Sequence, residues 1–358
     1  MKNLSFLIVL LILFTCTTKE KYNKDEVKKE FEKFPNSVRL NGKKTNTQNF
    51  RSMEIVGIID SLLIISSSLD KYEFYIFNKN NFNLITKEGK TGKGPKELTA
   101  AVNGNINKKS GYIYTGDRSK LKIFKFNIDS MLNKKNYLPS EYVNLPKNFA
   151  NASQIRVVND SLIFGLGMRE YSAVIINEKG EIIDTIGQIP NKPENINSNM
   201  HRNLYMKFMT YNNNQKKFAI SYFNFDKLNV YKLNGKRIFK IYGPDFIKTS
   251  YNDIKSPGAP RTAYWNMYSD NNYIYGLYSG KKGYEKDNSS FNGIKQNHPK
   301  KIFIYDWQGK PKLKVVLDRE SVDFTIDKNS NRLIAVSFKD RTLVVYNLKK
   351  IKKALSNL

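Results

Sequence analysis

The sequence KEGKTGKGPKELTAA (residues 87–101) holds three glycines in a short basic run, as loops that cradle phosphate groups do. A Walker loop needs a lysine after its second glycine; the spacing from Gly89 to Gly94 fits, but Pro95 occupies the lysine position. A dinucleotide fingerprint needs a third glycine where Glu97 stands. Both motifs also need a following helix, and strands are predicted there instead. We therefore interpret the run as a connection between β-strands, with glycines for positive φ and a proline for rigidity.

The chain has two histidines, His201 and His298, so histidine-based chemistry is limited to them. This count excludes a histidine-rich metal site and leaves a Ser-His-Asp triad two candidate bases. His201 follows the polar stretch NKPENINSNM, and His298 precedes a proline in a polar insertion. We interpret both as surface-loop histidines, and we expect no metal and no cofactor.

Carboxylates and tryptophans are the other candidates, because paired acids hydrolyse glycosidic bonds and indole rings can stack on sugars. Four aspartates fall in predicted hairpin turns, where carboxylates accept hydrogen bonds from the backbone: Asp60, Asp160, Asp270 and Asp306. Trp265 and Trp307 fall in a predicted strand and a tight turn, positions that favour packing. The sequence therefore assigns no catalytic residue.

The N-terminus, MKNLSFLIVLLILFTC, is typical of an export signal. Its apolar run over residues 4–14 is shorter than the roughly 20 residues of a transmembrane helix. LFTC resembles the bacterial lipobox, and Cys16 is the only cysteine, so there is no disulfide framework. We predict a lipoprotein signal peptide over residues 1–15, a lipidated Cys16 and a tether over residues 16–36. An ordinary signal peptide with an incidental cysteine is the alternative.

The chain of 358 residues carries a formal net charge of +28. Such an excess predicts an acidic partner, and export argues against nucleic acid. The competing explanation is codon bias, because Lys, Asn, Ile, Tyr and Phe are all abundant and the lysines are scattered. Both explanations remain open at the level of sequence.

A repeat of β-strands organises the rest of the chain. Six segments rich in β-branched or aromatic residues end in Asn or Asp, which marks a strand entering a turn: residues 75–78, 123–127, 174–177, 230–234, 303–306 and 344–347. Each is preceded by a matching strand: residues 62–66, 112–115, 162–165, 218–221, 273–277 and 333–337. Six four-stranded antiparallel units predict an all-β, six-bladed β-propeller over residues 37–350.

The ends of the predicted ring need a closing strand, because the sixth unit lacks a fourth strand. Residues 38–42, VRLNG, are expected to supply it from the N-terminal side. Residues 348–358 resemble a short amphipathic helix, so residues 351–358 are assigned to a C-terminal tail.

The glycine-rich run also carries a family resemblance. GKGPKEL, with Gly92, Gly94, Pro95 and Glu97, is similar to a G-x-G-P-G-E-[FYL] pattern of the six-bladed, TolB-like propeller lipoproteins of Bacteroidetes, although Lys96 stands at the usual third glycine. Residues 117–124 and 226–231 also resemble NHL-type propeller repeats. The resemblance implies the fold and a cell-envelope address, and it implies no activity.

Loop length predicts which face of the ring binds a ligand. In a four-stranded antiparallel blade the second and fourth connections emerge together, and the four longest predicted connections share that face: residues 89–97, 187–200, 243–260 and 280–299. The predicted ligand face contains Arg118, Arg169, Arg341, Tyr222 and Tyr278. Lysines of the opposite face, such as Lys79 and Lys179, are expected to matter little.

These observations favour a non-catalytic binding or scaffold lipoprotein that is lipid-anchored to the outer membrane, on its periplasmic or outer side. Its long-loop face would hold a protein, peptide or glycan ligand, and we expect a monomer. A propeller enzyme, a hydrolase or lyase acting on glycan or peptide, is the alternative. The scarcity of histidine and of unassigned acids favours the binding protein.

Overall fold

Strand-forming residues separated by Asn, Asp and Gly turns fold into small antiparallel sheets in the computed structural model. Blade one contains β4 (Glu54–Ile59), β5 (Leu62–Ser66), β6 (Tyr72–Asn78) and β7 (Leu84–Lys90), paired in that order. At the turn after β6, the Asn78 side chain accepts a hydrogen bond of 2.9 Å from the backbone of Asn80. Side chain and backbone thus cooperate to end the strand, as the sequence pattern predicts.

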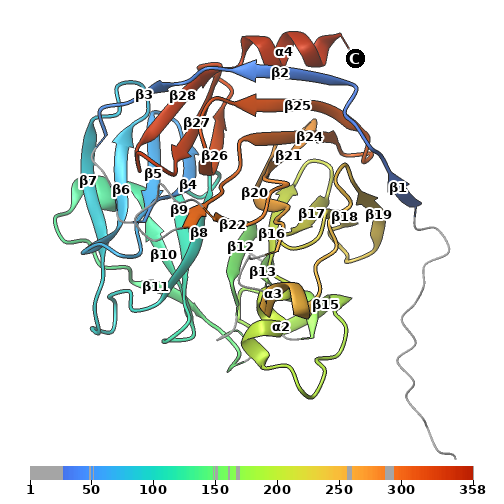
Figure 1. The fold of residues 1–358 in the computed structure, drawn as a ribbon. Helices are drawn as coiled ribbons and strands as arrows, with labels where there is room; N and C mark the ends of the chain where they lie inside the picture. The colour runs from blue at the N-terminus through green and yellow to red at the C-terminus, as the bar shows by residue number, and fades with distance from the viewer. Residues whose placement is uncertain are drawn as a thin grey trace, which may run out of the picture.

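Five further blades repeat this order around the ring (Figure 1). Blade two contains β8 (Ala101–Asn107), β9 (Tyr112–Asp117), β10 (Lys122–Asn127) and β11 (Glu141–Asn144); blade three contains β12 (Gln154–Asn159), β13 (Leu162–Leu166), β14 (Tyr171–Ile176) and β15 (Ile182–Gln188). Blade four contains β16 (Lys207–Asn212), β17 (Lys217–Tyr222), β18 (Lys227–Lys232) and β19 (Arg237–Tyr242); blade five contains β20 (Tyr264–Ser269), β21 (Tyr273–Tyr278), β24 (Lys301–Asp306) and β25 (Pro311–Leu317). Blade six contains β26 (Ser321–Asp327), β27 (Arg332–Ser337) and β28 (Leu343–Asn347). The six-bladed propeller prediction is confirmed.

The structure describes residues 27–47, 50, 52–147, 149, 152–159, 162–166, 170–255, 260–286 and 294–357. Cys16, Asp160 and Arg169 lie outside these residues. No helix among the described residues is long and apolar enough to cross a membrane.

Residues 27–44 form an N-terminal strap that joins three blades. β1 (Val27–Glu30) pairs in parallel with β19, β2 (Asn36–Leu40) pairs in parallel with β25, and β3 (Lys43–Lys44) pairs antiparallel with β28. In Figure 1 the blue β2 runs alongside β25, near the C-terminal helix. Closure by an N-terminal strand is thus confirmed.

The residues that complete blade six differ from the predicted residues 38–42. The stretch up to Leu40 belongs to blade five, and only Lys43 and Lys44 complete blade six. Gly42 lies between them, where an added Cβ would come within 2.4 Å of Val344 Cγ1. The chain therefore crosses blade six at a distance that only glycine permits, and β1 lies inside the predicted tether.

The remaining elements decorate the ring. They are helices α1 (Ile128–Asn133), α2 (Ser198–Leu204), α3 (Tyr251–Lys255) and α4 (Lys349–Ser356), and a hairpin of β22 (Tyr284–Lys286) and β23 (Ile294–Gln296). The predicted C-terminal helix is confirmed by α4, which buries Ile351. Trp307 is fully buried and its Nε1 donates a 2.9 Å hydrogen bond to the Asp270 carbonyl, as its packing role predicts.

Candidate functional site

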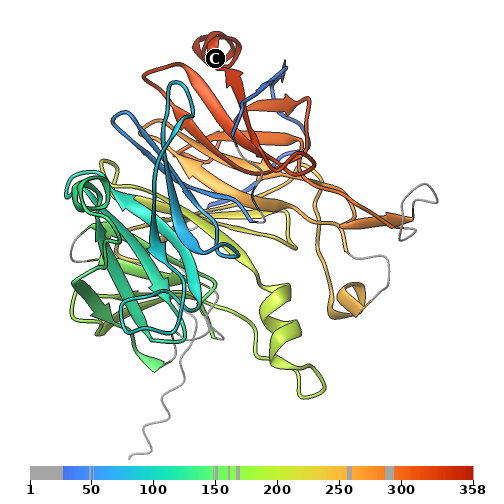
Figure 2. The same ribbon diagram turned by 90° about the vertical axis from the view of Figure 1, so that its left-hand side faces the viewer.

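The α2 helix, the α3 helix and the β22–β23 hairpin project from one face of the ring, on the right of Figure 2. We call this the long-loop face. α2 belongs to the connection between blades three and four, α3 to that between blades four and five, and the hairpin to the second connection of blade five. The topology predicted from the sequence therefore places the longest insertions together.

The glycine-rich run between β7 and β8 is a strand connection, as predicted. Glu97 folds back over it, and its Oε2 accepts a 2.9 Å hydrogen bond from the backbone nitrogen of Gly94. Lys120 donates to the carbonyls of Gly94 and Glu97. The backbone nitrogen of Gly94, which a bound phosphate would need as a donor, is already hydrogen-bonded to the Glu97 carboxylate. This argues against a phosphate-binding loop.

The reason for the glycines differs in part from the prediction. Gly89 has the expected positive φ of 73°. At Gly92 an added Cβ would lie 2.2 Å from Glu97 Oε2, and at Gly94 it would lie 3.0 Å from the same carboxylate. Glycine is needed at these two positions because Glu97 approaches closely, and neither residue has a left-handed backbone.

The prediction of two surface-loop histidines was wrong. His201 lies in α2 with 4% of its surface exposed, and its Nδ1 is 2.6 Å from the Tyr251 hydroxyl of α3. His298 is buried and its ring stacks on Phe338. Burial lowers the pKa of His298 to about 4, and burial with two nearby lysines lowers the pKa of His201. Both rings are therefore neutral at pH 7, and His201 joins the two helices.

The inner strands surround an axial channel of about 270 Å³. Asp323 lies in its wall, and its carboxylate accepts hydrogen bonds of 2.6 Å from the backbone nitrogens of Ile55 and Phe324 and a third from Asn266. Burial raises the pKa of Asp323 to about 7. Through these hydrogen bonds the carboxylate links blades one, five and six.

A groove on the long-loop face runs over blades three and four. It consists of two adjoining cavities of about 380 Å³ and 550 Å³. Four residues line both cavities: Gln188, Ile189, Pro190 and Tyr205. The long connections on either side of blade four form most of its walls, so this blade-three/four groove is a product of the insertions.

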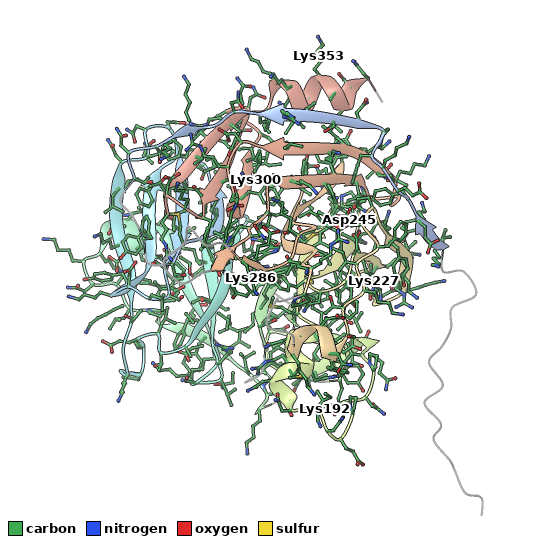
Figure 3. All side chains as sticks on the ribbon, in the orientation of Figure 1. Lys192, Lys227, Asp245, Lys286, Lys300 and Lys353 are labelled. Atoms are coloured by element: carbon green, nitrogen blue, oxygen red, sulfur yellow. The ribbon has the colours of Figure 1, made fainter. Side chains whose placement is uncertain are left out.

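Basic and aromatic side chains dominate the groove. Its basic lining residues are Lys28, Lys192, Arg202, Lys227 and Lys248. The Nζ of Lys227 lies 5.0 Å from the centre of the Tyr222 ring, within the range of a cation–π contact. Figure 3 shows Lys192 beside α2 and Lys227 in neighbouring blade four.

The acids of the groove are already engaged or lie at its rim. Glu30 forms a 2.6 Å ion pair with Lys28. Asp226 is buried, and its Oδ2 accepts hydrogen bonds from Tyr278 and from the backbone of Asp245 at 3.0 and 2.7 Å. Glu170 is exposed at the edge of the smaller cavity. The groove is therefore suited to anions.

The described residues of the predicted ligand face have three different placements. Tyr222 lines the larger cavity, and burial raises the pKa of its hydroxyl above the usual value. Tyr278 is fully buried behind the groove. Arg118 and Arg341 are exposed in turns of the same face, and neither lines a cavity of the groove. The sequence missed Lys248, Tyr205 and the buried Lys207, because nothing local marks them among the many lysines and tyrosines.

Six four-stranded blades, closed by an N-terminal strap, define a six-bladed β-propeller with a basic groove on one face. The chain belongs to the TolB-like six-bladed propeller family, whose model matches residues 31–329. This confirms the part of the sequence resemblance that concerns TolB-like six-bladed propellers.

Two solved structures have similar folds. A member of the DUF4221 family from Bacteroides vulgatus is 13% identical, with a TM-score of 0.59 over 86% of this chain and 95% of that one. A putative exported protein from Bacteroides fragilis is also 13% identical, with a TM-score of 0.53 over 90% and 98%. At this identity the likeness concerns the fold alone. A search of curated proteins found no match to the sequence.

Proposed function

We propose that the protein is a lipid-anchored, non-catalytic binding protein of the cell envelope. Its blade-three/four groove holds a protein, peptide or glycan ligand through carboxylate or phosphate groups. The observation that carries this proposal is the composition of the groove: lysines and an arginine line it beside tyrosines, and its acids are paired, buried or at the rim. Side chains of this kind bind anions and apolar surface together.

Binding of an anionic probe is expected to depend on the groove. We expect hexaglutamate and trigalacturonate to bind more tightly than hexaglutamine and an uncharged trisaccharide. Replacing Lys227 or Lys248 by alanine should weaken binding roughly three- to fivefold, because each removes one partly exposed charge contact. Arg118→Ala and Arg341→Ala should weaken the binding of a probe that is long enough to cross the face. Higher salt should weaken the binding of every anionic probe further. Fluorescence anisotropy measures all of these affinities.

The control lies on the opposite face of the ring. Lys179 is exposed in the turn between β14 and β15, so Lys179→Ala should leave the affinity unchanged. Lys79 is unsuitable, because it is buried and its Nζ lies 3.2 Å from Asp327 Oδ1. Equal losses from both faces would show that the net charge acts diffusely, which would contradict a defined site.

Acylation of Cys16 is the expected basis of envelope attachment. The export-type N-terminus and its lipobox-like end support it, and the similar B. fragilis protein is described as a putative exported protein. Radiolabelled palmitate should enter the wild type and be absent from Cys16→Ser, which should leave the membrane fraction. Equal labelling of both proteins would contradict the lipobox interpretation.

A further inference from the structure

Lys207 is a buried lysine with almost no partners. It begins β16, has 1% of its surface exposed, and its Nζ donates one hydrogen bond of 3.3 Å to the Tyr171 carbonyl. An ammonium group has three donors. No carboxylate of the described residues pairs with it. The ring therefore holds a buried cation whose hydrogen-bonding capacity is largely unused, which is costly.

The groups around Lys207 are neutral or positive. Lys227 of β18 is close enough to act on its charge, and both Lys207 and Lys192 act on the ring of His201 in α2. Tyr222 of β17 is its partner in the strand register, and burial raises the pKa of that hydroxyl. Burial and the charge of Lys227 lower the pKa of Lys207 to about 7. Among the described residues, Glu170 is the acid nearest in sequence to Tyr171; it is exposed at the edge of the smaller cavity, and no carboxylate of the described residues forms an ion pair with the ammonium.

Lys207 itself lines neither cavity of the groove, but two residues that interact with it line the smaller one. Tyr171, which accepts its hydrogen bond, and His201, which its charge affects, both line that cavity of about 380 Å³. Tyr205 lines both cavities. A space of this size accepts one end of a ligand and leaves the rest of the ligand to the larger cavity.

We propose that Lys207 is the anchor for a single oxyanion, a carboxylate or phosphate, at the end of the ligand. The terminal group enters the smaller cavity, and the flexible lysine stem turns the ammonium toward it. An oxyanion supplies the acceptors and the negative charge that Lys207 lacks, while the groove lysines contact the ligand outside. This inference rests on the proposed function and specifies which cation recognises the end of the ligand.

Lys207→Met tests the proposal, because methionine has a similar volume without the charge. Affinities for hexaglutamate and for a hexapeptide ending in phosphoserine distinguish the two kinds of oxyanion. We expect Lys207→Met to bind the preferred probe at least tenfold more weakly at pH 6, a larger loss than Lys227→Met causes. Calorimetry in buffers of different ionisation enthalpy should detect proton uptake on binding at pH 8 in the wild type and none in Lys207→Met.

Thermal unfolding separates binding from folding in this test. A merely structural Lys207 would leave affinity and proton uptake unchanged in Lys207→Met, and that result would overturn the inference while the groove variants still lost affinity. If the wild type bound no anionic probe, the proposed function would fail and this inference would fail with it. A folded Lys207→Met that loses binding supports the inference, because removal of an unpaired buried charge should not destabilise the ring.

Discussion

Deletion of residues 36–44 is expected to lower the free energy of unfolding by about 5 kcal/mol or more. This segment contains β2, which covers the edge of blade five, and β3, which completes blade six. Leu40, 4% exposed, lies in the apolar core shared by these blades. Loss of the closing strand exposes two sheet edges at once, so the whole ring should unfold at lower denaturant. Urea unfolding followed by circular dichroism measures the change.

Point variants of the strap test the same idea with less disturbance. Leu40→Ala removes a buried side chain and should cost about 2–4 kcal/mol. Val27→Ala is the matched control in β1, since Val27 is 47% exposed and should cost less than about 0.5 kcal/mol. An unchanged unfolding midpoint in both Leu40→Ala and the deletion would show that the strap does not close the ring.

Replacing Glu73 by glutamine is expected to stabilise the fold more at pH 8 than at pH 4. The change in the free energy of unfolding that the substitution causes should be about 3 kcal/mol more favourable at pH 8. Glu73 is 2% exposed; one carboxylate oxygen accepts from Ser66, and the other has no hydrogen-bond partner among the described residues. Burial raises its pKa from 4.5 to about 7, and the charge of Glu54 adds to the rise.

The direction in which stability changes with pH depends on whether the folded or the unfolded state holds the proton more tightly. Because the folded pKa of Glu73 is raised, its stabilising contribution is complete below pH 4.5 and is lost as the pH rises to about 7. Asp226 and Asp323, whose pKa values burial also raises to about 7, act in the same direction. Lys207 and His298 act in the opposite direction, because a lowered pKa makes stability rise with pH, from about pH 7 to 10.5 for Lys207 and from about pH 4 to 6.5 for His298. In the acidic range the three carboxyl groups outweigh His298.

Wild-type stability should therefore fall from about pH 4 to pH 7 and rise again toward pH 10. Thermal unfolding over this range measures the curve, and Glu73→Gln should flatten its acidic limb only. Lys179→Gln, an exposed surface change, should reproduce the wild-type curve. The account of Glu73 would be contradicted if Glu73→Gln kept the full wild-type slope between pH 4 and 7.

The blades could be predicted because their signals are local. Alternating strand residues and turn residues such as Asn78 recur in every unit, so strand positions follow from short stretches of sequence. The pairing of the N-terminal strap with blades five and six depends instead on contacts with residues about 300 positions away. Gly42 shows this most clearly, since its need for glycine comes from Val344 and not from its neighbours in sequence.

The site was harder to predict than the fold because the long connections fold back onto the ring. The sequence predicts a loop position for His201, but α2 buries it against Tyr251. Lys207 looks like any other lysine in a lysine-rich chain until the structure surrounds it with blades three and four. Topology alone did predict which face carries the long insertions, since connection order determines the side on which each insertion emerges.

Hydrogen–deuterium exchange of the intact protein with and without hexaglutamate tests the central claim, that the groove of the long-loop face is the binding site. The account predicts slower exchange in residues 188–205, which contribute to both cavities, and in residues 222–248, which contribute to the larger one. Slower exchange confined to the opposite-face turns at residues 178–181 and 307–310, with none in the groove, would contradict it.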